Sequence, residues 1–73
     1  MYVPQPIDTT RITLPESLDQ LVEHLAEHNH DIWAKQHPDL IPYADLSDGE
    51  KQYDRNSVIE TLKAIVALGY RIA

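Results

Sequence analysis

The sequence predicts a mainly α-helical domain of two antiparallel helices plus a short helix, with a small two-stranded β element joining the termini. Apolar residues follow a helical period from Glu16 to Trp33 and again from Val58 to Leu68. A Ser-x-x-Glu capping signal at Ser47 marks a further helix start between them. With 73 residues in total, the chain has the length of one domain, and we expect residues 1–73 to fold as a single unit.

The N-terminal stretch reads as an extended arm or short strand. Pro4 and Pro6 fix the backbone φ angle and remove hydrogen-bond donors. In the alternating segment that follows, Ile12 and Leu14 point to the same side of an extended chain. Residues 70–72, Tyr-Arg-Ile, resume an extended pattern after the last helix. We therefore expect these two segments to pair as strands.

The first helix begins near Pro15. Thr13 and Glu16 have capping-box spacing, although Leu14 as N-cap with Pro15 at the first helical position fits nearly as well. Pro38 disfavours helical geometry at the preceding residue, so the helix should end there or slightly earlier.

The second half of the chain carries two capping boxes. Ser47–Glu50 predicts the start of a short helix, and Ser57–Glu60 repeats the pattern ten residues later. We therefore expect an interruption at Asp54–Asn56, followed by a second long helix from Val58 to Leu68. Gly69 is its expected C-terminal stop.

Composition narrows the classes of function. Six basic against twelve acidic side chains give a formal net charge of −6, which argues against nucleic-acid and membrane-surface partners. The absence of cysteine fits a reducing cytoplasm. The longest apolar run, Ala64–Leu68, is far shorter than the roughly 20 residues of a membrane span. We expect a soluble, cytoplasmic protein.

No strong catalytic motif is present. His24, Glu27 and His28 match the H-x-x-E-H arrangement of some zinc proteases, but we identify no third ligand or cleft for a catalytic zinc. With only two glycines, the chain offers no phosphate-cradling loop. We expect no enzyme, no metal site and no cofactor.

Aromatic and charged residues gather around the only tryptophan. An indole, phenols and cations are the groups that bind a planar, anionic ligand such as a nucleotide, through stacking and charge-assisted hydrogen bonds. The candidate ligand-binding residues are His30, Trp33, Tyr43, Lys51, Asp54 and Arg55. The alternative is structural: Trp33 packs in the core, and Asp54 with Arg55 forms a local ion pair.

Several segments in the same order resemble the RyR domain, the repeat found in tandem in ryanodine receptors and as free-standing copies in bacteria and phages. They include residues 4–9 (Pro-Gln-Pro-Ile-Asp-Thr), 29–34 (Asn-His-Asp-Ile-Trp-Ala), 37–43 (His-Pro-Asp-Leu-Ile-Pro-Tyr) and 68–70 (Leu-Gly-Tyr). One departure is visible. Family members usually carry a further segment before the His-Pro stretch, and Lys35-Gln36 stands in its place, giving a compact form.

The resemblance implies two long antiparallel helices with short strands and no catalysis. In the receptors it implies an adenine nucleotide held between aromatic side chains, and in free-standing copies a sensor of nucleotide-derived ligands. We therefore predict a non-enzymatic binding module that recognises a nucleotide-like small molecule at the Trp33 corner. The alternative is a protein-interaction or oligomerisation module with no small-molecule ligand. A homo-oligomer is expected, because self-association would add burial to a small core.

Overall fold

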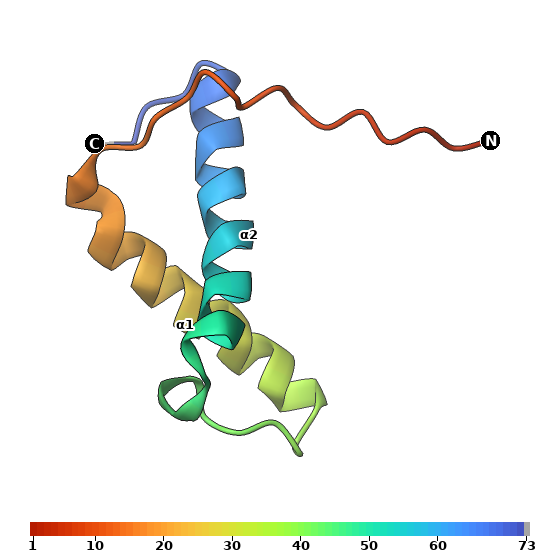
Figure 1. The fold of residues 1–73 in the computed structure, drawn as a ribbon, viewed down its shortest axis with the longest axis vertical. Coiled ribbons are helices and arrows are strands. Elements are labelled where there is room, and N and C mark those ends of the chain that lie inside the picture. Colours follow the sequence, from red (N-terminus) through yellow and green to blue (C-terminus); the bar gives the residue numbers. More distant parts are fainter. Residues whose placement is uncertain (73) are drawn as a thin grey trace.

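The computed structural model describes residues 1–72. Two long helices dominate it, α1 (Asp19–Gln36) and α2 (Asp48–Ala67), and α1 runs obliquely across the lower part of α2 (Figure 1). Two short 3₁₀ helices complete the order: η1 (Glu16–Leu18) leads into α1, and η2 (Tyr43–Asp45) lies between the long helices. The helical hairpin expected from the sequence is therefore present.

Prolines set both ends of the first helical segment. Pro15 is the N-cap of η1 with an extended backbone, and no side chain caps it, so the box between Thr13 and Glu16 does not form. α1 ends at Gln36, and His37 has the non-helical φ and ψ angles of −134° and 77° that a following proline favours. The predicted end of the helix is confirmed.

The capping box at Ser47 forms as predicted. Glu50 donates its backbone N–H to the Ser47 hydroxyl at 3.3 Å, and the Glu50 carboxylate accepts the Ser47 backbone N–H at 3.3 Å. The predicted interruption at Asp54–Asn56 is wrong, because α2 continues for 20 residues without a break. Ser57 therefore lies inside the helix and is not an N-cap.

Gly69 ends α2 as predicted. Its φ of 96° is in the left-handed region that glycine adopts without strain. The Gly69 N–H donates to the Val66 carbonyl at 2.9 Å, and the Tyr70 N–H donates to the Ile65 carbonyl at 3.2 Å. This pair of bonds is the Schellman motif, which satisfies carbonyls that the end of the helix leaves free.

The predicted two-stranded β element is wrong: residues 1–72 contain no strand. Local hydrogen bonds take the donors that a strand pair would need. The Thr10 N–H bonds the Asp8 carboxylate, the Ile12 N–H bonds the Thr9 carbonyl, and the Tyr70 N–H is used in the helix stop. Side chains from both segments nevertheless reach the same core, through Leu14 and Ile72.

The core is small and lies where the helices cross. Ala26 is fully buried at 0% exposure, and its methyl side chain lets the two helices approach closely. The buried cluster consists of Val22, Ala26, Tyr43, Val58 and Leu62. No helix within residues 1–72 combines the length and the apolar character needed to cross a membrane.

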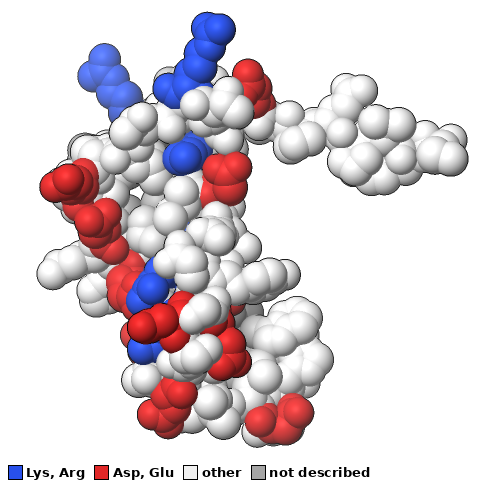
Figure 2. All heavy atoms as spheres, in the orientation of Figure 1, with Lys and Arg blue, Asp and Glu red and all other residues white. Residues whose placement is uncertain are grey.

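Residues 1–7 project from the body as an extended arm that carries no charged side chain (Figures 1 and 2). All seven are exposed, and none of them takes part in a hydrogen bond within the described chain. The radius of gyration is 14.1 Å, against about 11 Å for a compact chain of this length. The arm accounts for part of this excess.

The corrected start of α2 can be tested with two serine variants. We expect Ser47→Ala to lower the free energy of unfolding by about 1 kcal/mol, because it removes the N-cap acceptor. Ser57→Ala should change it by less than about 0.5 kcal/mol, because alanine is favourable inside an exposed helix. Urea denaturation followed by circular dichroism measures both. A larger loss for Ser57→Ala than for Ser47→Ala would contradict a continuous α2.

Candidate functional site

Tyr43 is the point at which the polar groups of both long helices meet. It comes from η2, is only 5% exposed, and donates its hydroxyl hydrogen to Glu23 of α1 at 2.9 Å. Its ring and that of His30 are in a T-shaped contact, with centroids 6.0 Å apart. On the α2 side, the Lys51 ammonium lies 5.6 Å from the centre of the same ring, in cation–π range.

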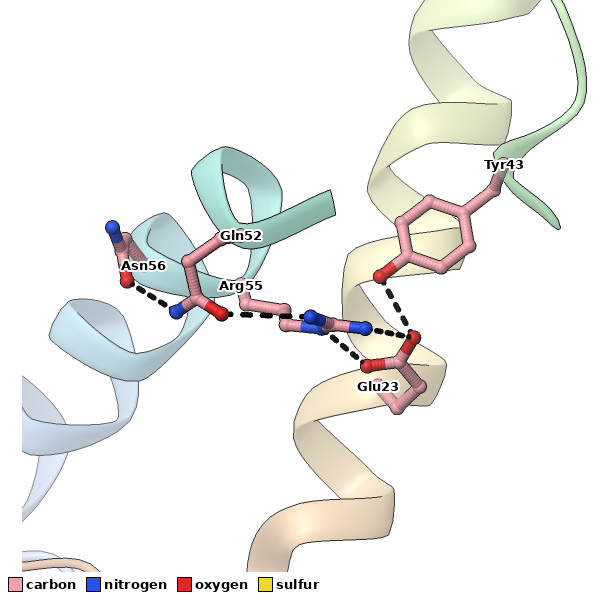
Figure 3. A network of polar contacts seen from close by, with 5 residues as sticks. All are labelled: Glu23, Tyr43, Gln52, Arg55 and Asn56. Atoms are coloured by element: carbon pink, nitrogen blue, oxygen red, sulfur yellow. Dashed lines mark hydrogen bonds and ion pairs between the residues drawn. The ribbon is translucent and has the colours of Figure 1, made fainter. Parts of the chain in front are cut away.

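The Glu23 carboxylate also binds Arg55 of α2 with both oxygens (Figure 3). The Arg55 Nε donates at 2.6 Å and its Nη2 at 3.0 Å, which is the strong bidentate geometry. Hydrogen bonding from Arg55 lowers the pKa of Glu23. Burial of the Tyr43 ring and its hydrogen bond to Glu23 raise the pKa of Tyr43. We call Glu23, Tyr43, Lys51 and Arg55 the inner cluster.

His30 links the inner cluster to the neighbouring surface. It is 9% exposed, and its Nε2 lies 2.8 Å from the Ile41 carbonyl. Since a carbonyl only accepts, Nε2 must carry the hydrogen. The other ring nitrogen, Nδ1, lies 3.7 Å from the Asp54 carboxylate. His30 thus holds the segment after Pro38 against α1, and its Nδ1 edge faces α2.

Next to His30 the surface is hollowed into two adjoining cavities of about 410 and 270 Å³. Both are lined by His30, Trp33, Tyr53 and Asp54. The larger one extends to Asn29 and Ser57, and the smaller one to Leu40, Leu46 and Glu50. We call this combined hollow the Trp33 cleft.

Two aromatic side chains are exposed at the Trp33 cleft. Trp33 is 58% exposed and Tyr53 is 77% exposed. The indole stacks on His37, with centroids 4.4 Å apart and an angle of 29° between the rings. One indole face is therefore partly covered by His37, and the structural alternative of a core-packed Trp33 is not what the structure shows.

The six predicted ligand-binding residues fall into two groups. His30, Trp33 and Asp54 line the cleft, whereas Tyr43, Lys51 and Arg55 belong to the inner cluster. Helix geometry causes the division. Lys51 and Arg55 share a face of α2 with the core residues Val58 and Leu62, while Glu50 and Asp54 lie on the adjacent face.

Sequence reasoning did not select Tyr53 or Glu50 as ligand residues. Both line the cleft with Asp54. Their signal was available as spacing, because Glu50, Tyr53 and Asp54 are three and four residues apart and share a face of the helix expected from Ser47. The spacing did not indicate that this face lines the cleft.

The histidine pair of the H-x-x-E-H sequence lies elsewhere. His24, Glu27 and His28 are all exposed on α1. Among residues 1–72, no group of three or more histidine and carboxylate side chains is arranged to hold a metal ion.

Comparison with known families identifies a matching domain model. The RyR domain model aligns with residues 2–36 and with residues 34–73, which together span almost the whole chain. The chain belongs to the RyR domain family. The two matched segments overlap at residues 34–36, which include the Lys35-Gln36 pair.

The ion pair of the inner cluster predicts a pH dependence of stability. Because the folded-state pKa of Glu23 lies below the ordinary value of 4.5, its contribution is present above that value and is lost as the pH falls through the folded-state pKa. We therefore expect Glu23→Gln to lower the denaturation midpoint at pH 7 and to converge with the wild type as the pH falls from about 5 to about 2.5.

Glu27→Gln is the matched control, because it removes an exposed carboxylate from the same helix. Its midpoint should follow the wild type at every pH. A Glu23→Gln protein whose deficit stays constant from pH 7 to about 2.5 would show that Glu23 is not held by a charge-dependent contact.

Proposed function

We propose that this RyR domain is a non-enzymatic binding module and that its ligand site is the Trp33 cleft. The main support for this site is that the exposed indole of Trp33 lies beside Tyr53 in a hollow between the two helices. A core this small would gain stability from burying a tryptophan. Leaving two aromatic rings exposed at one cleft is typical of a recognition surface.

A planar ring is the chemical group that this cleft suits best. One indole face is partly occupied by His37, and the rest of the ring is accessible for stacking. The larger cavity, at about 410 Å³, falls within the roughly 300–1,000 Å³ typical of small-molecule sites. A nucleotide-like ligand would stack its base here.

The two cations expected to bind a phosphate, Lys51 and Arg55, do not line the cleft. Arg55 is bonded to Glu23, and Lys51 lies over the Tyr43 ring. Recognition in the proposed site therefore depends on the ring of the ligand more than on a phosphate.

The non-enzymatic part of the proposal is supported by the contacts of Glu23 and Arg55. These two groups are bonded to each other and join the two helices, so neither is presented to a substrate in the cleft. We also place the protein in the cytoplasm, which the absence of cysteine supports.

Trp33 is the only tryptophan, so its fluorescence tests the proposed site directly. We expect nucleosides or nucleotides to change the emission on titration. Trp33→Ala should remain folded, losing well under the roughly 3 to 5 kcal/mol of a buried aromatic, and should lose binding by calorimetry. Tyr70→Ala removes an exposed aromatic outside the cleft and should bind normally. Emission that no ring compound alters would refute a stacking site at Trp33.

Self-association through the N-terminal arm is the second candidate function, and one observation favours it. The accessible surface is 6103 Å², whereas about 4,600 Å² is typical for a monomer of this mass. The arm exposes Tyr2, Val3 and Ile7, and its two prolines reduce the entropy lost on docking. An arm packed against a second copy would remove that apolar surface from water.

We expect light scattering at tens of micromolar to give a mass above that of one 8.4 kDa chain. Replacing Tyr2, Val3 and Ile7 together by serine should return the mass of the single chain without changing the helix content. Replacing the exposed Leu68 by serine is the control at another site. A wild type that scatters as a monomer would reject this candidate and leave the cleft proposal unaffected.

A further inference from the structure

We infer that the ligand of the Trp33 cleft is a flat heteroaromatic cation and that Asp54 is the group that recognises its charge. This inference rests on the proposed function of the cleft and names the class of ligand. It follows from the charge of the lining, the state of Asp54 and the aromatic faces beside it.

The lining carries two carboxylates and neither lysine nor arginine. The two carboxylates are those of Glu50 and Asp54. The basic residues that follow them in the sequence, Lys51 and Arg55, belong to the inner cluster and contact Tyr43 and Glu23. A phosphate in the cleft would meet two carboxylates, whereas a cation would be attracted by both.

Asp54 is available as the partner of a cation. Its side chain is only 27% exposed, and its nearest basic group is the His30 Nδ1 at 3.7 Å, beyond hydrogen-bonding distance. It accepts no hydrogen bond from any residue between 1 and 72. A partly buried carboxylate gains most from a ligand that brings an N–H donor or a positive charge.

Glu50 adds to the preference of the cleft for a cation, and its carboxylate is held in place. Its Oε1 accepts hydrogen bonds from the Ser47 amide and hydroxyl, which fixes the carboxylate at the start of α2. Glu50 and Asp54 are four residues apart on one helix face, where two like charges repel each other. A bound cation would relieve that repulsion.

The aromatic side chains suit the same ligand. A cation over the face of a tryptophan or tyrosine is attracted by the ring electrons, and the attraction is strongest for tryptophan. Trp33 and Tyr53 are both exposed at the cleft, on α1 and α2 respectively. A flat cation can therefore stack on the indole and reach the Asp54 carboxylate with its edge.

The net charge of the whole molecule also favours a cationic ligand. The net charge is −6, and acidic side chains outnumber basic ones on the lower half of the face in Figure 2. Figure 1 shows that this half contains the end of α1 and the start of α2. The long-range field will thus raise the local concentration of cations near the cleft.

Three ring-matched probes test the inference. 1-Methyladenosine carries a positive ring charge at pH 7, adenosine is neutral, and adenosine monophosphate is anionic. We expect calorimetry and Trp33 fluorescence to show that 1-methyladenosine binds about tenfold more tightly than adenosine at low salt. Adenosine monophosphate should bind more weakly than adenosine. Added salt should reduce the difference between the first two.

Charge-removing variants locate the effect. Asp54→Asn keeps the shape of the side chain and should bring 1-methyladenosine and adenosine to the same affinity. Glu50→Gln keeps the capping box and should reduce the ratio in part. Glu27→Gln removes the same net charge outside the cleft and should leave the ratio unchanged. An unchanged ratio in Asp54→Asn would overturn the role of Asp54.

The outcomes separate this inference from the function on which it rests. If adenosine or its monophosphate binds at least as tightly as 1-methyladenosine, the cleft binds planar rings and the inference about charge is wrong. If none of the three probes binds, the proposed function of the cleft and the inference fail together.

Discussion

The buried ring of Tyr43 is the constraint on which the arrangement of this domain depends. It inserts between α1 and α2 from the short η2, and its hydroxyl bonds the same Glu23 carboxylate that binds Arg55. A phenol in this position needs a polar partner for its hydroxyl, and Glu23 supplies it. Two helices that share little apolar area are thereby also joined by directional contacts, which fix how they cross.

This inner cluster also determines the character of the Trp33 cleft. By holding Lys51 and Arg55 on the core side of α2, it leaves the adjacent face to Glu50 and Asp54. The cleft therefore combines exposed aromatic rings with carboxylates. The same cations that stabilise the fold are the ones that a phosphate-binding site would have required.

The connection between the helices holds the wall of the Trp33 cleft in place. It begins at Pro38, where α1 must stop, and the Ile41 carbonyl is bonded to the buried His30. Leu40 and Leu46, on either side of η2, complete the wall. Because the loop is held at both ends and in the middle, a ligand at the proposed site would not have to order it. The exposed arm at the other end of the molecule has no such contacts among the described residues.

The sequence by itself determined the helices and the residue types near the cleft. Pro38, the Ser47 box and Gly69 act through their own backbone geometry or that of a neighbour, and local signals of this kind survive in the fold. Tertiary structure decided the rest. Ser57 carries an equally good box, but α2 is held to α1 on both sides of it, by the bonds of Arg55 to Glu23 before it and by the burial of Val58 after it. Local bonds at Thr10 and Tyr70 replaced the strand pair. Helix geometry places Lys51 and Arg55 on one face of α2 and Glu50 and Asp54 on the next, but only packing against Tyr43 and α1 decided which of these faces turns toward the core. Composition near Trp33 could therefore name the residues involved without dividing them between core and cleft.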